Sequence, residues 1–330
     1  MRDFLFSFKS SALFIGTLIG AGFATGEEIK SYFMGANIWS VVFSAVLFGL
    51  MCGICLCFGK IKTKRLCRTI MLVWKTFMNV CVIISLIAML LAAEEVVYDL
   101  FSIRYGSVLT LGICYFIVLR YQDQLGFLNA VIVPIIVVFI FVVVLKSDIS
   151  VVHGRFESSS AFLYATMNVF SAGMMMKSWG SKMSAKQVIS SSFLTFIIVG
   201  SLMICIKLVV DNSTGSMPFL VMAKNVGVGV LSEIVVFLAI LTTMLSDVAL
   251  LRPLFDKTSN KISAFCLLFF GLLVCIVPFG FSHVVQYGYP VIGICGAIYI
   301  CYAIYSLATV RGKFFLQKRN DCVHSTGKRT

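Results

Sequence analysis

The chain consists of long apolar runs separated by short polar segments. Ten runs stand out, each close to the roughly 20 residues that an α-helix needs to cross about 30 Å of hydrocarbon. Their approximate bounds are 8–33, 37–58, 71–98, 103–119, 126–145, 161–179, 187–210, 228–250, 262–281 and 286–309. This pattern predicts an all-α integral membrane protein with ten transmembrane helices.

The first run is interrupted by polar and flexible residues that a continuous membrane helix does not need. Glycines stand at positions 16, 20, 22 and 26, and Glu27 and Glu28 follow directly. A glycine weakens a helix by roughly 1 kcal/mol, and a charge at bilayer depth costs at least about 2.5 kcal/mol. The segment therefore predicts a discontinuous helix whose free backbone groups face a buried site. The alternative for the glycines is close helix packing, because they are four residues apart.

The ten runs divide into five and five, and the first run of each half is the irregular one. In the second half, Asn168 and the Ser171-Ala172-Gly173 segment interrupt the run. Such residues can satisfy unwound backbone, which predicts a second discontinuous helix; the alternative is an Asn that bridges two packed helices. The arrangement predicts a single transporter domain, 1–310, built from inverted repeats at about 8–145 and 161–310. A basic, disordered cytoplasmic tail, 311–330, follows.

Composition and charge place the chain in a bilayer. Hydrophobic residues make up 60% of the chain and charged residues 12%, and the mean hydropathy is +1.01, which excludes a soluble domain. Lysine and arginine concentrate in the segments on the same side as the N-terminus, such as 60–68 and 311–329. The positive-inside rule then puts both termini on the cytoplasmic side of the membrane. Anionic lipid accounts for the net charge of +13 without a nucleic-acid partner.

The sequence shows no residue pattern typical of a disulfide framework, a metal cluster or an enzyme active site. Most of the 12 cysteines lie within apolar runs, where thiols pack as small apolar groups, so we expect no disulfide framework and no metal cluster. No Ser-His-Asp set and no phosphate loop occurs, so we expect no enzyme activity and no organic cofactor. No sequence feature indicates an oligomeric state.

Three short segments resemble a known family. Gly20-Ala21-Gly22-Phe23-Ala24-Thr25-Gly26-Glu27-Glu28-Ile29, Leu163-Tyr164-Ala165-Thr166-Met167-Asn168 and Thr242-Thr243 are similar to the YkvI-type bacterial membrane proteins. These resemble distant members of the amino acid-polyamine-organocation (APC) superfamily, with the LeuT-like 5+5 inverted-repeat fold. The resemblance covers about 8–310. Where the family usually shows Ser-Gly-Gln-Glu, this chain has Thr25-Gly26-Glu27-Glu28.

The resemblance implies an amino-acid-like or amine solute, which we expect at the two helix breaks. The free amides of a half-helix suit a carboxylate, and one of the two glutamates can meet an ammonium group or carry a proton. The alternative for these glutamates is a solvated position or a pair with Lys30. The candidate solute-binding residues are Ala21, Gly22, Phe23, Glu27, Glu28, Tyr164, Asn168, Ser171 and Gly173.

The resemblance also implies a sodium site between the first and eighth helices. Carbonyl groups of Gly16, Ile19 and Ala239 and the hydroxyls of Thr242 and Thr243 would supply its oxygen ligands. The alternative is that the two threonines bond to the preceding turn of their own helix.

These expectations together describe a symporter that works by alternating access, coupled to sodium or to protons. A permease-like receptor that binds a small molecule without transport is the alternative. The roles of two further acids stay open. Asp247 either faces the inner pathway or pairs with Arg252, and Glu233 is placed to pair with Lys207.

Overall fold

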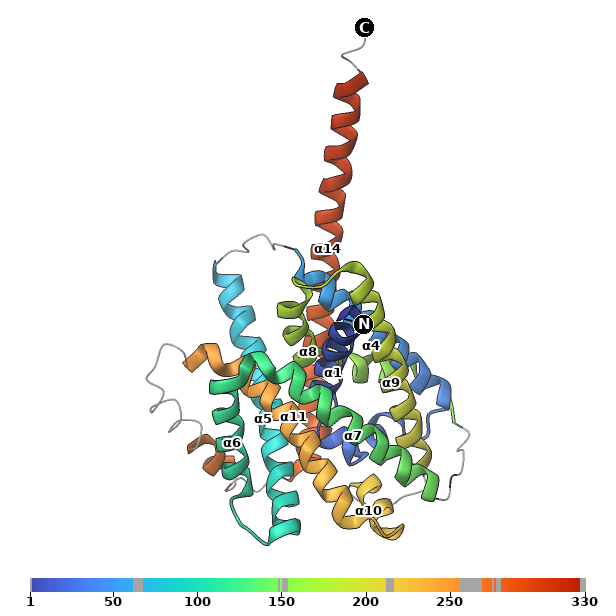
Figure 1. Cartoon of the computed structure of the whole chain (residues 1–330), viewed down its shortest axis with the longest axis vertical. Coiled ribbons are helices and arrows are strands. Elements are labelled where there is room, and N and C mark those ends of the chain that lie inside the picture. Colours follow the sequence, from blue (N-terminus) through green and yellow to red (C-terminus); the bar gives the residue numbers. More distant parts are fainter. Residues whose placement is uncertain are drawn as a thin grey trace.

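The protein is a bundle of helices (Figure 1). The computed structural model describes residues 2–61, 68–147, 149, 154–211, 217–255, 269–274, 276 and 280–326. Within these residues the chain forms helices and no strand; an isolated bridge joins Ala36 to Arg155. That bridge joins the segment before α4 (Ile38–Gly59) to the segment before α8 (Ser158–Gly180).

The first apolar run is divided into three helices, as its glycines predicted. They are α1 (Arg2–Leu18), α2 (Ala21–Ala24) and α3 (Glu27–Phe33). Gly20 is extended, with φ −92° and ψ −167°, and Gly26 has φ +77°, a value that L-residues other than glycine rarely adopt. All residues from Ser10 to Gly26 are buried, so both interruptions lie inside the bundle.

The rest of the first half consists of continuous helices. Asn37 caps the first of them, because its Oδ1 accepts a hydrogen bond from the Ser40 amide at 3.1 Å. The elements are α4 (Ile38–Gly59), α5 (Arg68–Phe101), α6 (Gly106–Tyr121), the 3₁₀ turn η1 (Gln122–Gln124) and α7 (Leu125–Lys146).

The second half begins with a helix that corrects one prediction. α8 (Ser158–Gly180) is one unbroken helix, so the expected break at Ser171-Ala172-Gly173 is wrong. The physical reason is that the polar side chains bond within the helix: Asn168 Nδ2 donates to the Tyr164 carbonyl at 3.2 Å. The remaining elements are α9 (Ala185–Val210), α10 (Pro218–Asn225), α11 (Gly229–Phe255), α13 (Phe281–His283), the π-helical turn η2 (Val284–Gly288) and α14 (Tyr289–Thr326).

The C-terminal segment also differs from the prediction. Instead of a disordered tail, α14 continues as helix to Thr326 and projects out of the bundle (Figure 1). Starting a helix costs free energy, whereas extending an existing helix costs little. The apolar part of α14 inside the bundle provides the start, and the C-terminal residues extend it.

Several helices are long and apolar enough to cross a membrane, which indicates a membrane-embedded protein. Within the described residues, 6 segments meet this condition: Ile38–Gly59, Trp74–Phe101, Gly106–Lys146, Ala185–Val210, Gly229–Leu254 and Phe281–Thr309. The ninth predicted run, 262–281, lies mostly outside the described residues. The ten crossings and the inverted repeat therefore stay predictions.

The interior of the bundle is organised around the divided first run and α8. α8 packs on α4 and α14, α1 packs on α7 and α9, and α11 packs on α5. The Tyr164 ring of α8 is buried, with edge contacts to Phe33 and Phe48 at centroid distances of 5.3 and 5.8 Å. α8 thereby lies against both α3 and α4, beside the interruptions of the first run.

Candidate functional site

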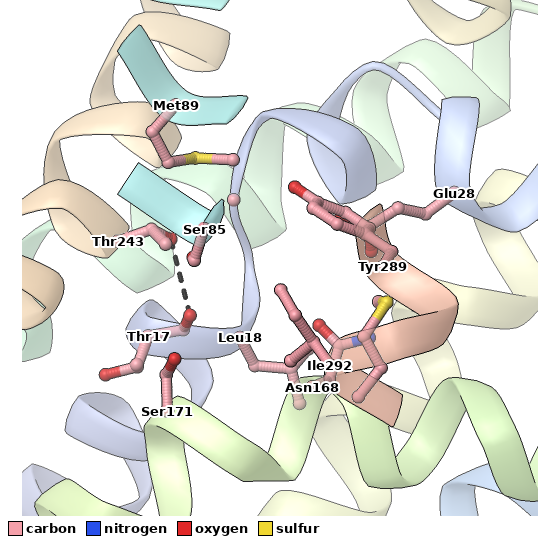
Figure 2. Close-up of a pocket in the computed structure, with 12 residues that line it drawn as sticks. Thr17, Leu18, Glu28, Ser85, Met89, Asn168, Ser171, Thr243, Tyr289 and Ile292 are labelled. Atoms are coloured by element: carbon pink, nitrogen blue, oxygen red, sulfur yellow. Dashed lines mark hydrogen bonds between the residues drawn. The ribbon is translucent and has the colours of Figure 1, made fainter. Parts of the chain in front are cut away.

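A small cavity lies where the first run is interrupted. Its walls come from α1 and α3, from α5, α8 and α11, and from the start of α14 (Figure 2). The lining residues are Thr17, Leu18, Gly20, Glu28, Ser85, Met89, Met167, Asn168, Ser171, Thr243, Tyr289 and Ile292. Its volume is about 30 Å³. That space holds a water molecule or a bare ion, whereas pockets for drug-sized ligands measure about 300–1,000 Å³.

Gly20 is the residue at which the chain leaves helical geometry. α1 closes with a bond from the Ile19 amide to the Ile15 carbonyl at 2.7 Å, and the Gly20 amide turns back to the Leu18 carbonyl at 3.0 Å. A Cβ on Gly20 would lie 3.1 Å from Met89 Sδ and 3.2 Å from Thr243 Oγ1. Glycine therefore lets the backbone approach α5 and α11 at the cavity.

Glu28 is a buried carboxylate at the cavity wall. It is 3% exposed, and its Oε2 has no hydrogen-bond partner. The Tyr164 and Asn168 side chains lie beside it, and Figure 2 shows Tyr289 next to it. The Glu28 side chain fills the space over Gly22, because a Cβ on Gly22 would overlap its Cγ and carboxylate atoms. An unpaired buried acid is costly, so this position calls for a cationic partner or a proton.

Asp247 of α11 is a second buried carboxylate near the cavity. It is 0% exposed; Oδ2 accepts a hydrogen bond from Ser85 Oγ at 2.7 Å, and Oδ1 has no partner. Arg252 does not pair with it, since the guanidinium donates to the Val118 carbonyl and to Gln122 Oε1. Asp247 is not itself a lining residue and reaches the cavity only through Ser85, so its position on the pathway stays a prediction.

The predicted sodium-site residues are only partly brought together. Thr243 Oγ1 donates to the carbonyls of Gly16 and Thr17 at 3.4 and 3.3 Å, which links α11 to the end of α1 (Figure 2). Thr242 Oγ1 instead donates to the Ala239 carbonyl of its own helix at 2.8 Å. A bond within its own helix was the alternative expected for this threonine. Thr242 and Ala239, both expected as sodium ligands, are therefore bonded to each other.

Close packing explains one glycine of the expected sodium set. A Cβ on Gly16 would overlap the Asn129 side chain of α7. The Asn129 amide donates to the Leu125 carbonyl at 3.0 Å, while its Oδ1 has no partner. Ile19 has a fully buried side chain in the last turn before the break. Gly16 therefore serves the helix packing that was the alternative to unwinding.

Three of the predicted solute-binding residues line the cavity, namely Glu28, Asn168 and Ser171. The others lie behind it or away from it. Tyr164 lies beside Glu28 but does not line the cavity. Gly173 packs against Tyr299, whose hydroxyl donates to the Gly173 carbonyl at 3.2 Å. Ala21, Gly22 and Phe23 form the buried α2 and are not among the lining residues.

Glu27 is not at the cavity. Its Oε2 accepts a hydrogen bond from the Met217 amide at 3.1 Å, at the start of α10. The neighbouring Phe219 amide donates to the Thr25 carbonyl at 2.9 Å. α10 is therefore fastened to the segment between α2 and α3, and the two adjacent glutamates have different surroundings.

Lys224 fastens the other end of α10. Its Nζ lies 2.8 Å from Glu233 at the start of α11 and 3.6 Å from Asp99 at the end of α5. The hydrogen bond to Glu233 raises the pKa of Lys224 above its ordinary value. The predicted pair of Glu233 with Lys207 is wrong, because Lys207 bonds to Asp211 at 2.8 Å and to the Phe33 carbonyl at 2.9 Å.

Several lining residues were missed by sequence reasoning. Ser85 is a polar residue in the middle of the third apolar run, which was an available signal, and Met89 follows one turn later. Tyr289 and Ile292 belong to α14, directly after the π-helical turn Val284–Gly288. Single π-turns occur frequently at functional sites, but the sequence pattern does not show them.

The chain matches no protein-family model and no curated protein.

Proposed function

We propose that the chain is a secondary active transporter, a symporter that moves a small amine or amino-acid-like solute by alternating access. The observation that carries this proposal is the interruption of the buried first run at Gly20, beside a cavity that contains the Glu28 carboxylate. Interrupted membrane helices are tolerated where their backbone lines a polar cavity, and such cavities are typical solute sites of inverted-repeat transporters. The resemblance to YkvI-type proteins and the APC superfamily supports the same function.

The chemistry of the cavity favours a cationic group on the solute. Glu28 supplies a negative charge, and no ion pair within the described residues reaches it. The Tyr164 and Asn168 side chains beside it are neutral. An ammonium group carries up to three donors and neutralises the carboxylate, which a neutral solute would not do. Since the cavity is only about 30 Å³, binding requires wall helices such as α3, α5 or α14 to move and widen it.

Coupling to sodium or to protons accounts for accumulation of the solute. In this proposal the protein lies in a bacterial cell membrane with both termini on the cytoplasmic side, because most basic segments fall on the side of the N-terminus. A cation that enters the cavity neutralises a buried carboxylate and thereby stabilises the conformation in which the solute is enclosed. The gradient of this cation across the membrane then drives solute transport.

The test is uptake by purified protein reconstituted in liposomes. Labelled amino acids and amines are supplied under an imposed sodium gradient or pH gradient, with empty liposomes as the blank. We expect gradient-dependent uptake that Glu28→Gln abolishes and Glu27→Gln largely retains, because the neighbouring Glu27 faces the Met217 amide and not the cavity. Equal loss in both variants would contradict the assignment of Glu28. Saturable binding without any flux would identify the permease-like receptor instead.

A further inference from the structure

We infer that Asp247, Ser85 and Ser171 form a binding site for a small dehydrated monovalent cation of the sodium type. The site is one helical turn beyond Thr243, so it differs from the sodium position that the family resemblance implies. It deepens the proposed function, because it assigns the coupling ion to particular residues. Cation binding can nevertheless be measured without any solute.

The first argument is the incomplete coordination of the Asp247 carboxylate. The side chain is 0% exposed, Oδ2 accepts one bond from Ser85 at 2.7 Å, and Oδ1 accepts none. Within the part of the chain that the structure describes, ion pairs join Lys207 to Asp211 and Lys224 to Asp99 and Glu233, and none reaches Asp247. The Asp247 carboxylate is therefore buried without a protein cation that could balance its negative charge.

The second argument is the set of oxygen atoms around this carboxylate. Ser85 comes from α5 and Ser171 from α8, and both hydroxyl-bearing side chains lie beside Asp247 of α11. Three helices thus contribute oxygen atoms to one position. Hard cations prefer oxygen ligands, and one carboxylate with neutral hydroxyls balances a single positive charge and not two.

The third argument is access from the cavity. Ser85 and Ser171 both line it (Figure 2). Asp247 lies behind Ser85, so an ion in the cavity meets the hydroxyl that bonds to this carboxylate. The volume of about 30 Å³ suits a bare ion. Glu28 lines the same cavity as Ser85, so the proposed solute group and the ion share one cavity.

Thr243 is a weaker centre for the same ion. Its hydroxyl already donates to the Gly16 and Thr17 carbonyls, and Ser246 is bonded to Thr17 at 2.8 Å. An ion at that position would have to replace bonds that hold α11 to α1. At Asp247 an ion can bind Oδ1 without breaking any bond between α11 and α1.

The experiment measures thermal unfolding of the purified full chain in detergent, without solute, in sodium chloride or choline chloride at equal ionic strength. A ligand that binds only the folded protein raises its melting temperature in a concentration-dependent way. We expect a saturable rise with sodium that Asp247→Asn removes and Thr243→Val retains. Asp247→Asn in choline should melt no lower than the original chain in choline, since the amide removes an unbalanced charge.

A second pair of variants keeps the test decisive if Asp247→Asn does not fold. Ser85→Ala should weaken the apparent sodium affinity by about tenfold, the lower end of the range for removing a group that supports a metal ligand. Ser192→Ala is the matched control, because Ser192 is a half-buried serine that bonds within α9 at 2.9 Å and lies away from the cavity. Direct binding of radioactive sodium ions gives an independent readout of the same variants.

Three results would overturn the inference. The first is loss of the sodium effect in Thr243→Val with retention in Asp247→Asn, which places the ion at the threonines. The second is no stabilisation of the original chain by sodium, lithium or potassium. The third is an equal effect in Ser85→Ala and Ser192→Ala. A chain that binds sodium but does not move any solute would leave this site standing and contradict the proposed transport alone.

Discussion

The Thr243 hydroxyl donates to the Thr17 carbonyl at 3.3 Å and so ties α11 to the last turn of α1. The next residue on α11, Thr242, directs its hydroxyl to the Ala239 carbonyl of its own helix. The two adjacent threonines thus have different roles: one links two helices at the cavity and the other bonds locally. This difference gives a direct test of the contact.

Thr243→Val should lower the melting temperature more than Thr242→Val. Valine keeps the shape of threonine but removes the hydroxyl, so the first variant loses a bond between helices. Hydrogen bonds between membrane helices contribute about 0.6 kcal/mol on average and up to about 1.7 kcal/mol. Thermal unfolding in detergent measures the difference, which should be the same in sodium and in choline. A larger loss for Thr242→Val would contradict the arrangement.

The two positive-φ glycines near α3 give a matched pair. Gly26 has φ +77° and a Cβ there would lie 2.6 Å from Val210 Cγ2, whereas Gly35 has φ +75° and open space around it. Gly35→Ala should cost only the backbone strain of about 1–2 kcal/mol, and Gly26→Ala should cost that strain plus a steric overlap. Fluorescence-detected size exclusion after heating compares the two. Equal melting temperatures would show that α3 and α9 do not meet as described.

The sequence predicted the interruption of the first run because clustered glycines and adjacent acids both destabilise a continuous helix in lipid. It could not predict which glutamate faces the cavity. Successive residues of a helix point about 100° apart, so the direction of each side chain depends on where α3 begins after the turn at Gly26. Glu28 points inward and Glu27 toward α10 for that reason.

The second interruption was wrongly predicted for a different physical reason. Asn and Ser can satisfy either an unwound backbone or a carbonyl one turn earlier in a regular helix, and composition does not distinguish the two. In α8 the Asn168 amide bonds to Tyr164. The cluster of Asp247 with Ser85 was also out of reach, because it depends on how α5 and α11 pack and not on any spacing along the chain.

Lys224→Gln should loosen α10. The variant removes the charge that lies between Glu233 and Asp99, so amide hydrogen exchange of residues 219–225 should become faster. Hydrogen exchange with mass spectrometry measures this, and exchange within α4 serves as the internal reference. Unchanged protection of residues 219–225 would show that the bonds of Met217 and Phe219 hold α10 without Lys224.

The same contact has a defined pH dependence. Because the pKa of Lys224 is raised by Glu233, its stabilising effect is present at neutral pH and is lost only as the pH rises above the ordinary lysine value of about 10.4. Protection of α10 should therefore stay constant between about pH 7 and 9. A decrease within that interval would mean that another group holds α10.

The contact between Cys81 and Cys295 predicts a cross-link that reports on the cavity. The two Sγ atoms are 3.2 Å apart, between α5 and α14, and a disulfide needs about 2.05 Å. A membrane-permeant oxidant should join them after a movement of about 1 Å. Peptide mass spectrometry identifies the bond, which Cys81→Ser and Cys295→Ser must each abolish.

Because Ser85 and Met89 of α5 and Tyr289 and Ile292 of α14 line the cavity, the bond should also fix these two walls against each other. If widening the cavity requires α5 and α14 to separate, oxidation stops uptake and a reductant restores it; uptake that continues in fully cross-linked protein would assign the movement to α3 and α10 instead.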